Sequence, residues 1–99
     1  MDKKILTLTL KKELFEDIKS GKKRAEYRVF KPYWIKRLLN KDGSFKKFNL
    51  VNFRNGYHKN APTILIEIIG IRIIKERKYW FFSQKYFEIE LGQIVNTNT

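Results

Sequence analysis

The N-terminal part of the chain changes its hydrophobic period twice within 25 residues. Residues 5–10 alternate apolar and polar side chains from Leu6 onward, which predicts a half-buried strand. In residues 11–20 the apolar positions fall on one helical stripe, and Gly21 stands where a helix C-cap is expected. The pattern therefore predicts a strand followed by a short helix that ends at Gly21.

The next segment alternates charged and apolar residues. A strand here would carry Ala25, Tyr27 and Val29 on one face. Its other face would carry the charged residues at positions 24, 26 and 28. We expect the apolar face to join the core and the charged face to point outward. The core is then expected to include Tyr27, Ile66, Ile68, Phe87 and Ile89.

The rest of the chain predicts a second helix and several strands. The helix starts at Pro32, and strands are expected over residues 48–53, 63–71, 87–91 and 94–95. Residues 75–78 read as a charged connection. The aromatic residues 79–82 are interpreted as a lid on the core or a self-association surface rather than a base-stacking platform. This order predicts an α+β domain, a curved sheet or barrel of five or six strands with two short helices, over residues 1–95, followed by a frayed tail, 96–99.

Composition narrows the classes of function. The 99 residues allow one small domain, and they contain no cysteine and a single histidine. Disulfides, thiolate metal sites and multi-histidine metal sites are therefore excluded, and no cofactor is expected. No apolar run reaches the roughly 18 residues of a membrane span. The N-terminus has no apolar signal core, so we expect a cytoplasmic protein that does not bind membranes.

Charge is the strongest global feature. The chain carries 22 Lys and Arg against 10 Asp and Glu, a formal net charge of +12. Residues 1–50 hold 15 basic and 6 acidic side chains, and residues 51–99 hold 7 and 4, so the net charges are +9 and +3. Clustered cations bind phosphate backbones through counterion release, which predicts a nucleic-acid partner.

Four blocks of the sequence, at residues 21–28, 32–38, 53–62 and 87–92, resemble ASCH domains, which belong to the PUA-like superfamily. Gly21-Lys22-Lys23 followed by Glu26 and Arg28 resembles the family signature G-x-K-x-x-E-x-R. The segments 32–38, 53–62 and 87–92 are similar to a compact subgroup found in phages and prophages. The resemblance covers nearly the whole chain. It implies a PUA-like β-barrel with a cleft beside the first helix, and binding of RNA; the sequence leaves DNA open as the alternative nucleic acid.

Twelve residues are candidates for that binding site. The signature strand offers cations around one carboxylate, which would orient guanidinium groups toward a phosphate or a base edge. The second helix and the loop near residue 57 add cations, donors and aromatic rings. The candidates are Lys22, Lys23, Arg24, Glu26, Arg28, Tyr33, Arg37, Arg54, Asn55, Tyr57, His58 and Lys59. Trp34 is assigned to the core, because it shares a helical face with Leu38.

Two other functions stay open. Some short ASCH proteins resemble acetylcytidine amidohydrolases, whose Lys matches Lys23, whereas their Thr nucleophile corresponds to Glu26. If the chain is such an enzyme, Lys23, Glu26 and Glu67 are the candidate catalytic residues, with Glu26 or Glu67 activating water. The missing nucleophile argues against catalysis. The second alternative is a phage-type interaction protein that binds or inhibits a host protein or a ribonucleoprotein.

Overall fold

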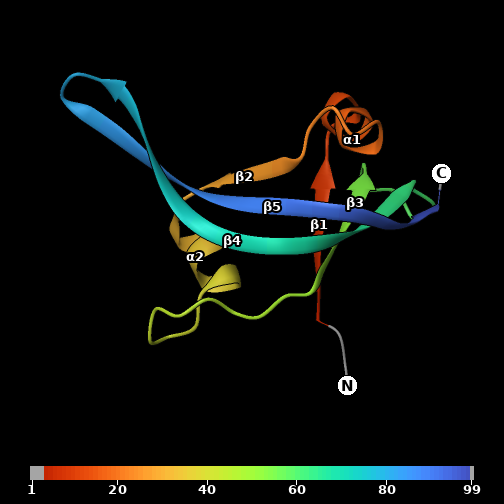
Figure 1. The fold of residues 1–99 in the computed structure, drawn as a ribbon, viewed down its shortest axis with the longest axis horizontal. Coiled ribbons are helices and arrows are strands. Elements are labelled where there is room, and N and C mark those ends of the chain that lie inside the picture. Colours follow the sequence, from red (N-terminus) through yellow and green to blue (C-terminus); the bar gives the residue numbers. More distant parts are fainter. Residues whose placement is uncertain (1–3, 99) are drawn as a thin grey trace.

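Residues 4–98, the part of the chain that the computed structural model describes, form a mixed sheet and two short helices (Figure 1). The strands are β1 (Ile5–Leu10), β2 (Ala25–Val29), β3 (Leu50–Asn55), β4 (Thr63–Tyr79) and β5 (Phe82–Asn98). The helices are α1 (Lys12–Lys19) and α2 (Pro32–Leu38). The strand order in the sheet is β1-β3-β4-β5-β2, and β1 and β3 form its one parallel pair. The predicted α+β class, with a curved sheet and two short helices, is confirmed.

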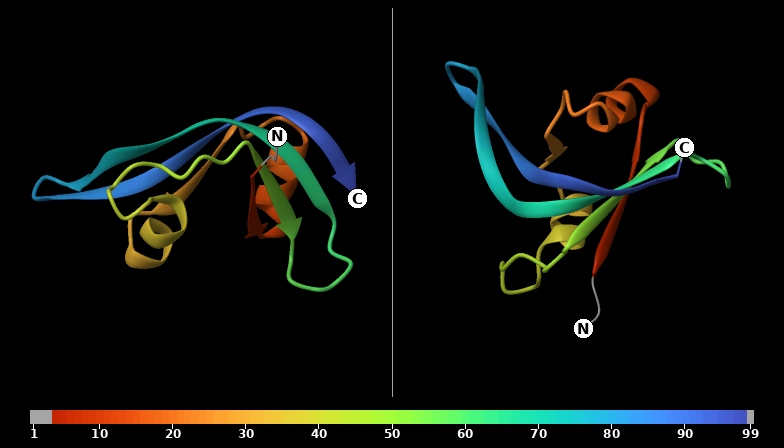
Figure 2. Two further views of the ribbon diagram at one scale, coloured as in Figure 1. Left: turned by 90° about the horizontal axis from the view of Figure 1, so that it is seen from below. Right: turned by 45° about the vertical axis from the view of Figure 1, so that its right-hand side comes forward.

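Both helices lie under the arched sheet (Figure 2). Phe15 and Ile18 of α1 are buried, and their spacing of three residues places them on one helix face. They pack with alternate residues of the strands. The buried strand residues of this core are Leu6, Leu8, Leu10, Val51, Phe53, Ile64, Ile66, Phe87, Ile89 and Leu91. The alternation in β1 and the helical stripe of α1 therefore predicted correctly which side chains are buried.

Local signals set the ends of both helices as expected. Gly21 has a φ of +83°, a left-handed conformation that glycine adopts without strain. Its N–H donates to the carbonyl oxygen of Ile18, which closes the last turn of α1. Pro32 occupies the first turn of α2, where its missing N–H costs no helical hydrogen bond. These two positions orient the chain on either side of β2.

The sheet does not close into a barrel. Strands β1 and β2 are its two edges, and no backbone pairing joins them within residues 4–98. Side chains cross the gap instead. Arg28 of β2 donates from Nη2 to the carbonyl oxygen of Thr9, and Arg37 of α2 donates from Nη2 to that of Thr7. The edge of β1 thus receives guanidinium groups where a closed barrel would have a neighbouring strand.

Strand β2 is inverted relative to the prediction. Tyr27 is 42% exposed and Val29 is exposed, whereas Glu26 is buried at 2%. The prediction assumed that a carboxylate must stay in water. In the structure Lys23 and Arg28 form ion pairs with Glu26, and this pairing offsets the desolvation cost of burying the carboxylate. Of the core positions predicted from the pattern, Tyr27 is therefore wrong.

Other predicted core positions hold. Ile66, Phe87 and Ile89 are buried, and Ile68 is a partly buried residue packed against the core. The strand boundaries of the second half differ more. Residues 75–78 belong to β4 instead of a connection, and residues 94–95 continue β5 instead of forming a sixth strand.

Two features explain the length of β4 and β5. Register shifts between Leu65 and Gly70 bend the hairpin, so that both 17-residue strands follow the curvature of the sheet. Gly92 lies between the predicted strands 87–91 and 94–95, but in the structure it lets a continuous β5 pass close to β4, because a Cβ there would lie 3.1 Å from Glu67 Oε1. The expected tail also differs. Residues 96–98 pair with residues 63–65, and Thr99 lies outside the described residues.

Candidate functional site

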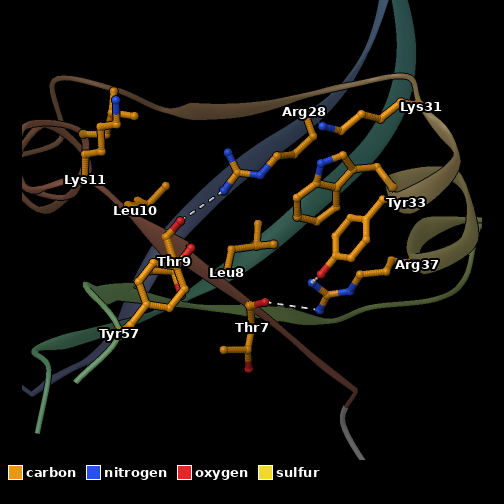
Figure 3. Close-up of a pocket in the computed structure, with 12 residues that line it drawn as sticks. Thr7, Leu8, Thr9, Leu10, Lys11, Arg28, Lys31, Tyr33, Arg37 and Tyr57 are labelled. Atoms are coloured by element: carbon orange, nitrogen blue, oxygen red, sulfur yellow. Dashed lines mark hydrogen bonds between the residues drawn. The ribbon is translucent and has the colours of Figure 1, made fainter. Parts of the chain in front are cut away.

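A cavity of about 750 Å³, the edge cavity, lies along the free edge of β1 (Figure 3). The start of α1, the end of β2, helix α2 and the loop after β3 surround it. Its lining residues are Thr7, Leu8, Thr9, Leu10, Lys11, Leu14, Arg28, Lys31, Tyr33, Trp34, Arg37 and Tyr57. Four of them are cations and none is a carboxylate. The edge cavity therefore suits an anionic ligand.

Trp34 contacts two guanidinium groups in this cavity. Cζ of Arg28 lies 5.1 Å from the centroid of the indole, and Cζ of Arg37 lies 5.4 Å from it. Arg37 also lies 5.8 Å from the ring of Tyr33, which meets Trp34 edge to face at 4.8 Å. Cation–π contacts of this kind fix the guanidinium planes against the rings. The result is an ordered cluster of two aromatic rings and two arginines.

The free edge of β1 adds main-chain groups to the same wall. Both arginines reach across to it, and their bonds to the carbonyl oxygens are long, 3.4 Å to Thr9 and 3.3 Å to Thr7 (Figure 3). Nε of Arg28 is buried and donates to no group among residues 4–98. Hydrogen bonds as long as those to Thr9 and Thr7 are weak, so the two Nη2 groups can exchange them for bonds to a ligand.

Glu26, which does not line the edge cavity, forms an ion pair with Arg28. Its Oε2 lies 2.9 Å from Nη1 of Arg28 in an ion pair. Its Oε1 accepts hydrogen bonds from Nζ of Lys23 at 2.9 Å and from the backbone N–H of Tyr27 at 3.0 Å. The sequence makes this possible because residues 26 and 28 share a strand face, while Lys23 reaches the same carboxylate from the turn after α1.

The predicted site residues divide into two groups. The structure brings Arg28, Tyr33, Arg37 and Tyr57 together in the edge cavity, with Lys23 and Glu26 behind Arg28. It does not bring the remaining six there. These are Lys22, Arg24, Arg54, Asn55, His58 and Lys59.

Different contacts hold that second group elsewhere. Lys22 and Arg24 line a separate hollow beside Tyr27 and Glu88. Arg54 donates from Nη2 to the carbonyl oxygen of His58 at 2.7 Å, so it braces its own loop. Asn55 donates its backbone N–H to Pro62 across the same loop, and His58 and Lys59 are exposed. Within this loop, only Tyr57 reaches the edge cavity.

Sequence reasoning missed a different set of lining residues. Lys11 and Lys31 precede α1 and α2, and both helices begin at the cavity. Trp34, assigned to the core, packs against it and also lines the cavity. The threonines of β1 were the available signal. Their alternation with leucines predicted the strand, but a single chain's pattern does not show which strand edge stays unpaired.

The candidate catalytic residues are only partly assembled. Lys23 and Glu26 are in contact, but Glu67 is exposed and accepts the backbone N–H of Gln93. It alternates with Ile66 on β4, so it lies on the face of the sheet opposite the core that Glu26 enters. Residues 4–98 contain no group of three or more His, Asp or Glu placed to hold a metal ion.

A second cluster around a carboxylate, Glu88, lies on the outer face of the sheet. Glu88 of β5 bonds Nε of Arg72 and accepts a hydrogen bond from the Tyr27 hydroxyl at 3.0 Å. The bond from Arg72, followed by that from Tyr27, lowers the pKa of Glu88 below its usual 4.5. The same bond to Glu88 raises the pKa of Tyr27 above 10.0. This cluster links β2, β4 and β5 and is separate from the edge cavity.

Comparison of the chain with protein-family models, with curated proteins and with solved structures gave no match. The geometry of the site therefore carries the functional argument. Within the part of the chain that the structure describes, no helix is long and apolar enough to cross a membrane.

Proposed function

We propose that the edge cavity binds single-stranded nucleic acid, RNA in preference to DNA. The observation that carries this proposal is the contact of Trp34 with the guanidinium groups of Arg28 and Arg37 in a cavity without a lining carboxylate. Unpaired bases stack on aromatic rings and on guanidinium planes, and arginine pairs with phosphate oxygens in a bidentate geometry. One wall thus offers both kinds of contact that a nucleotide needs.

The size of the cavity supports a small ligand portion instead of a duplex. Its volume of about 750 Å³ lies within the range of roughly 300–1,000 Å³ that is usual for small-molecule sites. One or two unpaired nucleotides fit this range. The net charge of +12 would supply the sequence-independent attraction that draws the rest of the strand to the surface.

The resemblance to ASCH domains supports the same function and is itself part of the proposal. Its signature Lys, Glu and Arg correspond to Lys23, Glu26 and Arg28, which form one connected ion cluster. In this proposal Arg28 contacts the ligand, whereas Glu26 and Lys23 hold Arg28 in position. A preference for RNA would come from contacts with the 2′-hydroxyl.

Arg37→Ala is the sharpest test, because Arg37 forms no ion pair with a carboxylate among the described residues. We expect it to weaken binding of a labelled single-stranded RNA by about 1–3 kcal/mol, the scale of a charge-assisted contact. Fluorescence anisotropy measures the affinity. Lys36→Ala is the matched control: it removes the same charge from the neighbouring, exposed position of α2, which does not line the cavity.

Salt dependence separates a specific site from a basic surface. A plot of the logarithm of the binding constant against the logarithm of salt concentration should fall with a slope of about 0.7 for each phosphate of the single strand that the protein contacts. Arg37→Ala should remove one such contact and so reduce the slope by about 0.7. Equal losses for Arg37→Ala and Lys36→Ala would contradict the proposed site. Absence of RNA binding at about 50 mM salt would overturn the proposed function altogether.

A further inference from the structure

The β4–β5 hairpin extends beyond the rest of the sheet as a two-stranded arm, residues 75–85 (Figure 1). Strand β2 ends opposite Tyr86, where Val29 pairs with it, so no third strand flanks the arm. Both views in Figure 2 show the arm projecting away from the helices. An isolated two-stranded ribbon is at best marginally stable in water, so pairing of its two strands contributes little free energy to the stability of the arm.

The tip of the arm exposes four consecutive aromatic residues. Tyr79 is 64% exposed, Trp80 83%, Phe81 70% and Phe82 46%. The interpretation of residues 79–82 as a lid on the core is therefore wrong. A contiguous apolar patch of this kind on a small domain marks a site of interaction with a partner.

The aromatic rings at the tip have a defined arrangement. Tyr79 and Phe81 stack at 5.6 Å with an interplanar angle of 10°, and Trp80 meets Phe81 edge to face at 5.2 Å. Nη2 of Arg77 donates to the carbonyl oxygen of Trp80 at 3.0 Å, which ties the turn to the strand. Flat, ordered rings lose little conformational entropy when another flat ring stacks on them.

The charge of the arm selects among partners. It carries Lys75, Arg77, Lys78 and Lys85 against Glu76, a net charge of +3. A second copy of the arm would bring two such clusters together and would be repelled. A partner with flat rings and negative charges satisfies both the aromatic tip and its cations. Single-stranded nucleic acid has both features along its whole length.

We propose that the arm is a second contact for the RNA strand whose nucleotides occupy the edge cavity, with bases stacking on Trp80 and Phe81. The inference rests on the proposed function. It adds that one strand contacts the molecule at two separated aromatic sites. Affinity should therefore depend on RNA length, because a short oligonucleotide reaches the cavity alone.

Trp80 provides a direct probe. Its emission is obtained as the difference between wild type and a Trp80→Phe protein, so that Trp34, the other tryptophan, stays in place in the edge cavity. We expect the emission of Trp80 to be quenched by an oligouridylate of about 16 nucleotides, near the upper site size of single-strand-binding domains, and to be unaffected by a uridine trinucleotide. Anionic phosphatidylglycerol vesicles are added in a parallel titration.

Affinity measurements give the second readout. The double variant Trp80→Ala with Phe81→Ala should bind the long oligonucleotide at least about 30-fold more weakly than wild type and bind the trinucleotide equally well. The double variant Ile69→Ala with Val95→Ala is the control, because it shortens two exposed apolar side chains of the same hairpin outside the arm. It should bind both oligonucleotides as wild type does.

The two proposals fail in different ways. Unchanged affinity of the Trp80 and Phe81 variant for the long RNA, with Arg37→Ala still weakening the trinucleotide, would overturn the arm contact alone. A blue shift of Trp80 on vesicles without quenching by RNA would overturn it in favour of a lipid surface. A dimer of the wild-type protein that the variant abolishes would overturn it in favour of self-association. A wild-type protein that binds neither oligonucleotide would contradict both proposals.

Discussion

Two glutamates on adjacent, paired strands show how different the two faces of this sheet are. Glu26 pairs in register with Ile89, and Glu88 pairs with Tyr27, so the two carboxylates are one step apart on β2 and β5 and point to opposite faces. The Glu26 side chain is 2% exposed, beside Lys23 and Arg28. The Glu88 side chain is 13% exposed, and its partner Arg72 is 67% exposed.

The inner cluster is more deeply buried than the outer one, so its loss should cost more stability. Desolvating Glu26 is costly unless both neighbouring cations remain, and removing one member of a buried cluster leaves an uncompensated charge. The same cluster directs Arg28 toward Trp34 and the edge cavity. The outer cluster joins strands at the surface, where Arg72 is mostly in water and an ion pair contributes little to stability. Similar residue types therefore have very different effects on opposite faces.

The largest expected effect is that of Glu26→Gln. The amide keeps the shape of the carboxylate but leaves Lys23 and Arg28 without their counter-charge, so we expect unfolding free energy to fall by about 3 kcal/mol. Urea denaturation followed by circular dichroism measures the loss. Glu16→Gln is the matched control, because it makes the same change at an exposed position of α1. Equal losses in the two variants would contradict the role assigned to Glu26.

Lys23→Ala should cost less, about 1 kcal/mol. The Lys23 side chain is 24% exposed, and without it Glu26 keeps its ion pair with Arg28 and its bond from the N–H of Tyr27. The double variant Lys23→Ala with Glu26→Gln should lose less stability than the sum of the two single losses. Once residue 26 is glutamine, Lys23 has no carboxylate to pair with, so its removal breaks no ion pair. Strict additivity in urea denaturation would show that the two residues do not interact.

The contrast between the faces also explains what sequence reasoning found and missed. Alternation located β1 and the core, because Leu6, Leu8 and Leu10 need no partner except other apolar groups. The same rule inverted β2, because Glu26 is buried by virtue of two cations, one of which lies outside the strand. A pattern of apolar and polar residues does not show that cations elsewhere in the fold will pair with a buried carboxylate.

The candidate site was predictable for similar reasons only in part. Arg28 and Arg37 were candidates because they are cations in segments that resemble ASCH domains, and both lie in the edge cavity. Thr7 and Thr9 gained their importance from tertiary structure, since the sheet leaves that edge of β1 unpaired. The arm was missed because Lys75 to Lys78 look like a solvated loop. Pairing across the hairpin, Lys75 with Lys85 and Arg77 with Ser83, makes them a strand.

The smallest effect should come from Glu88→Gln, and pH makes it measurable. The bonds from Arg72 and Tyr27 lower the pKa of Glu88 in the folded protein below its usual 4.5, so the carboxylate stabilises the fold above the unfolded-state pKa. That contribution is lost as pH falls through the folded-state pKa. The raised pKa of Tyr27 gives the opposite sign: its bond stabilises the fold below about pH 10 and is lost as the phenol ionises.

Thermal unfolding of wild type and Glu88→Gln as a function of pH tests the sign expected for Glu88. The difference in Tm between the two proteins should be greatest near neutral pH and shrink toward acid pH, where the wild-type carboxylate becomes protonated. Asp42, whose pKa is lowered by its bond from Ser44, also contributes to acid destabilisation, but it does so in both proteins and cancels in the difference. A difference in Tm that stays constant on acidification would show that the charge of Glu88 does not stabilise the outer face.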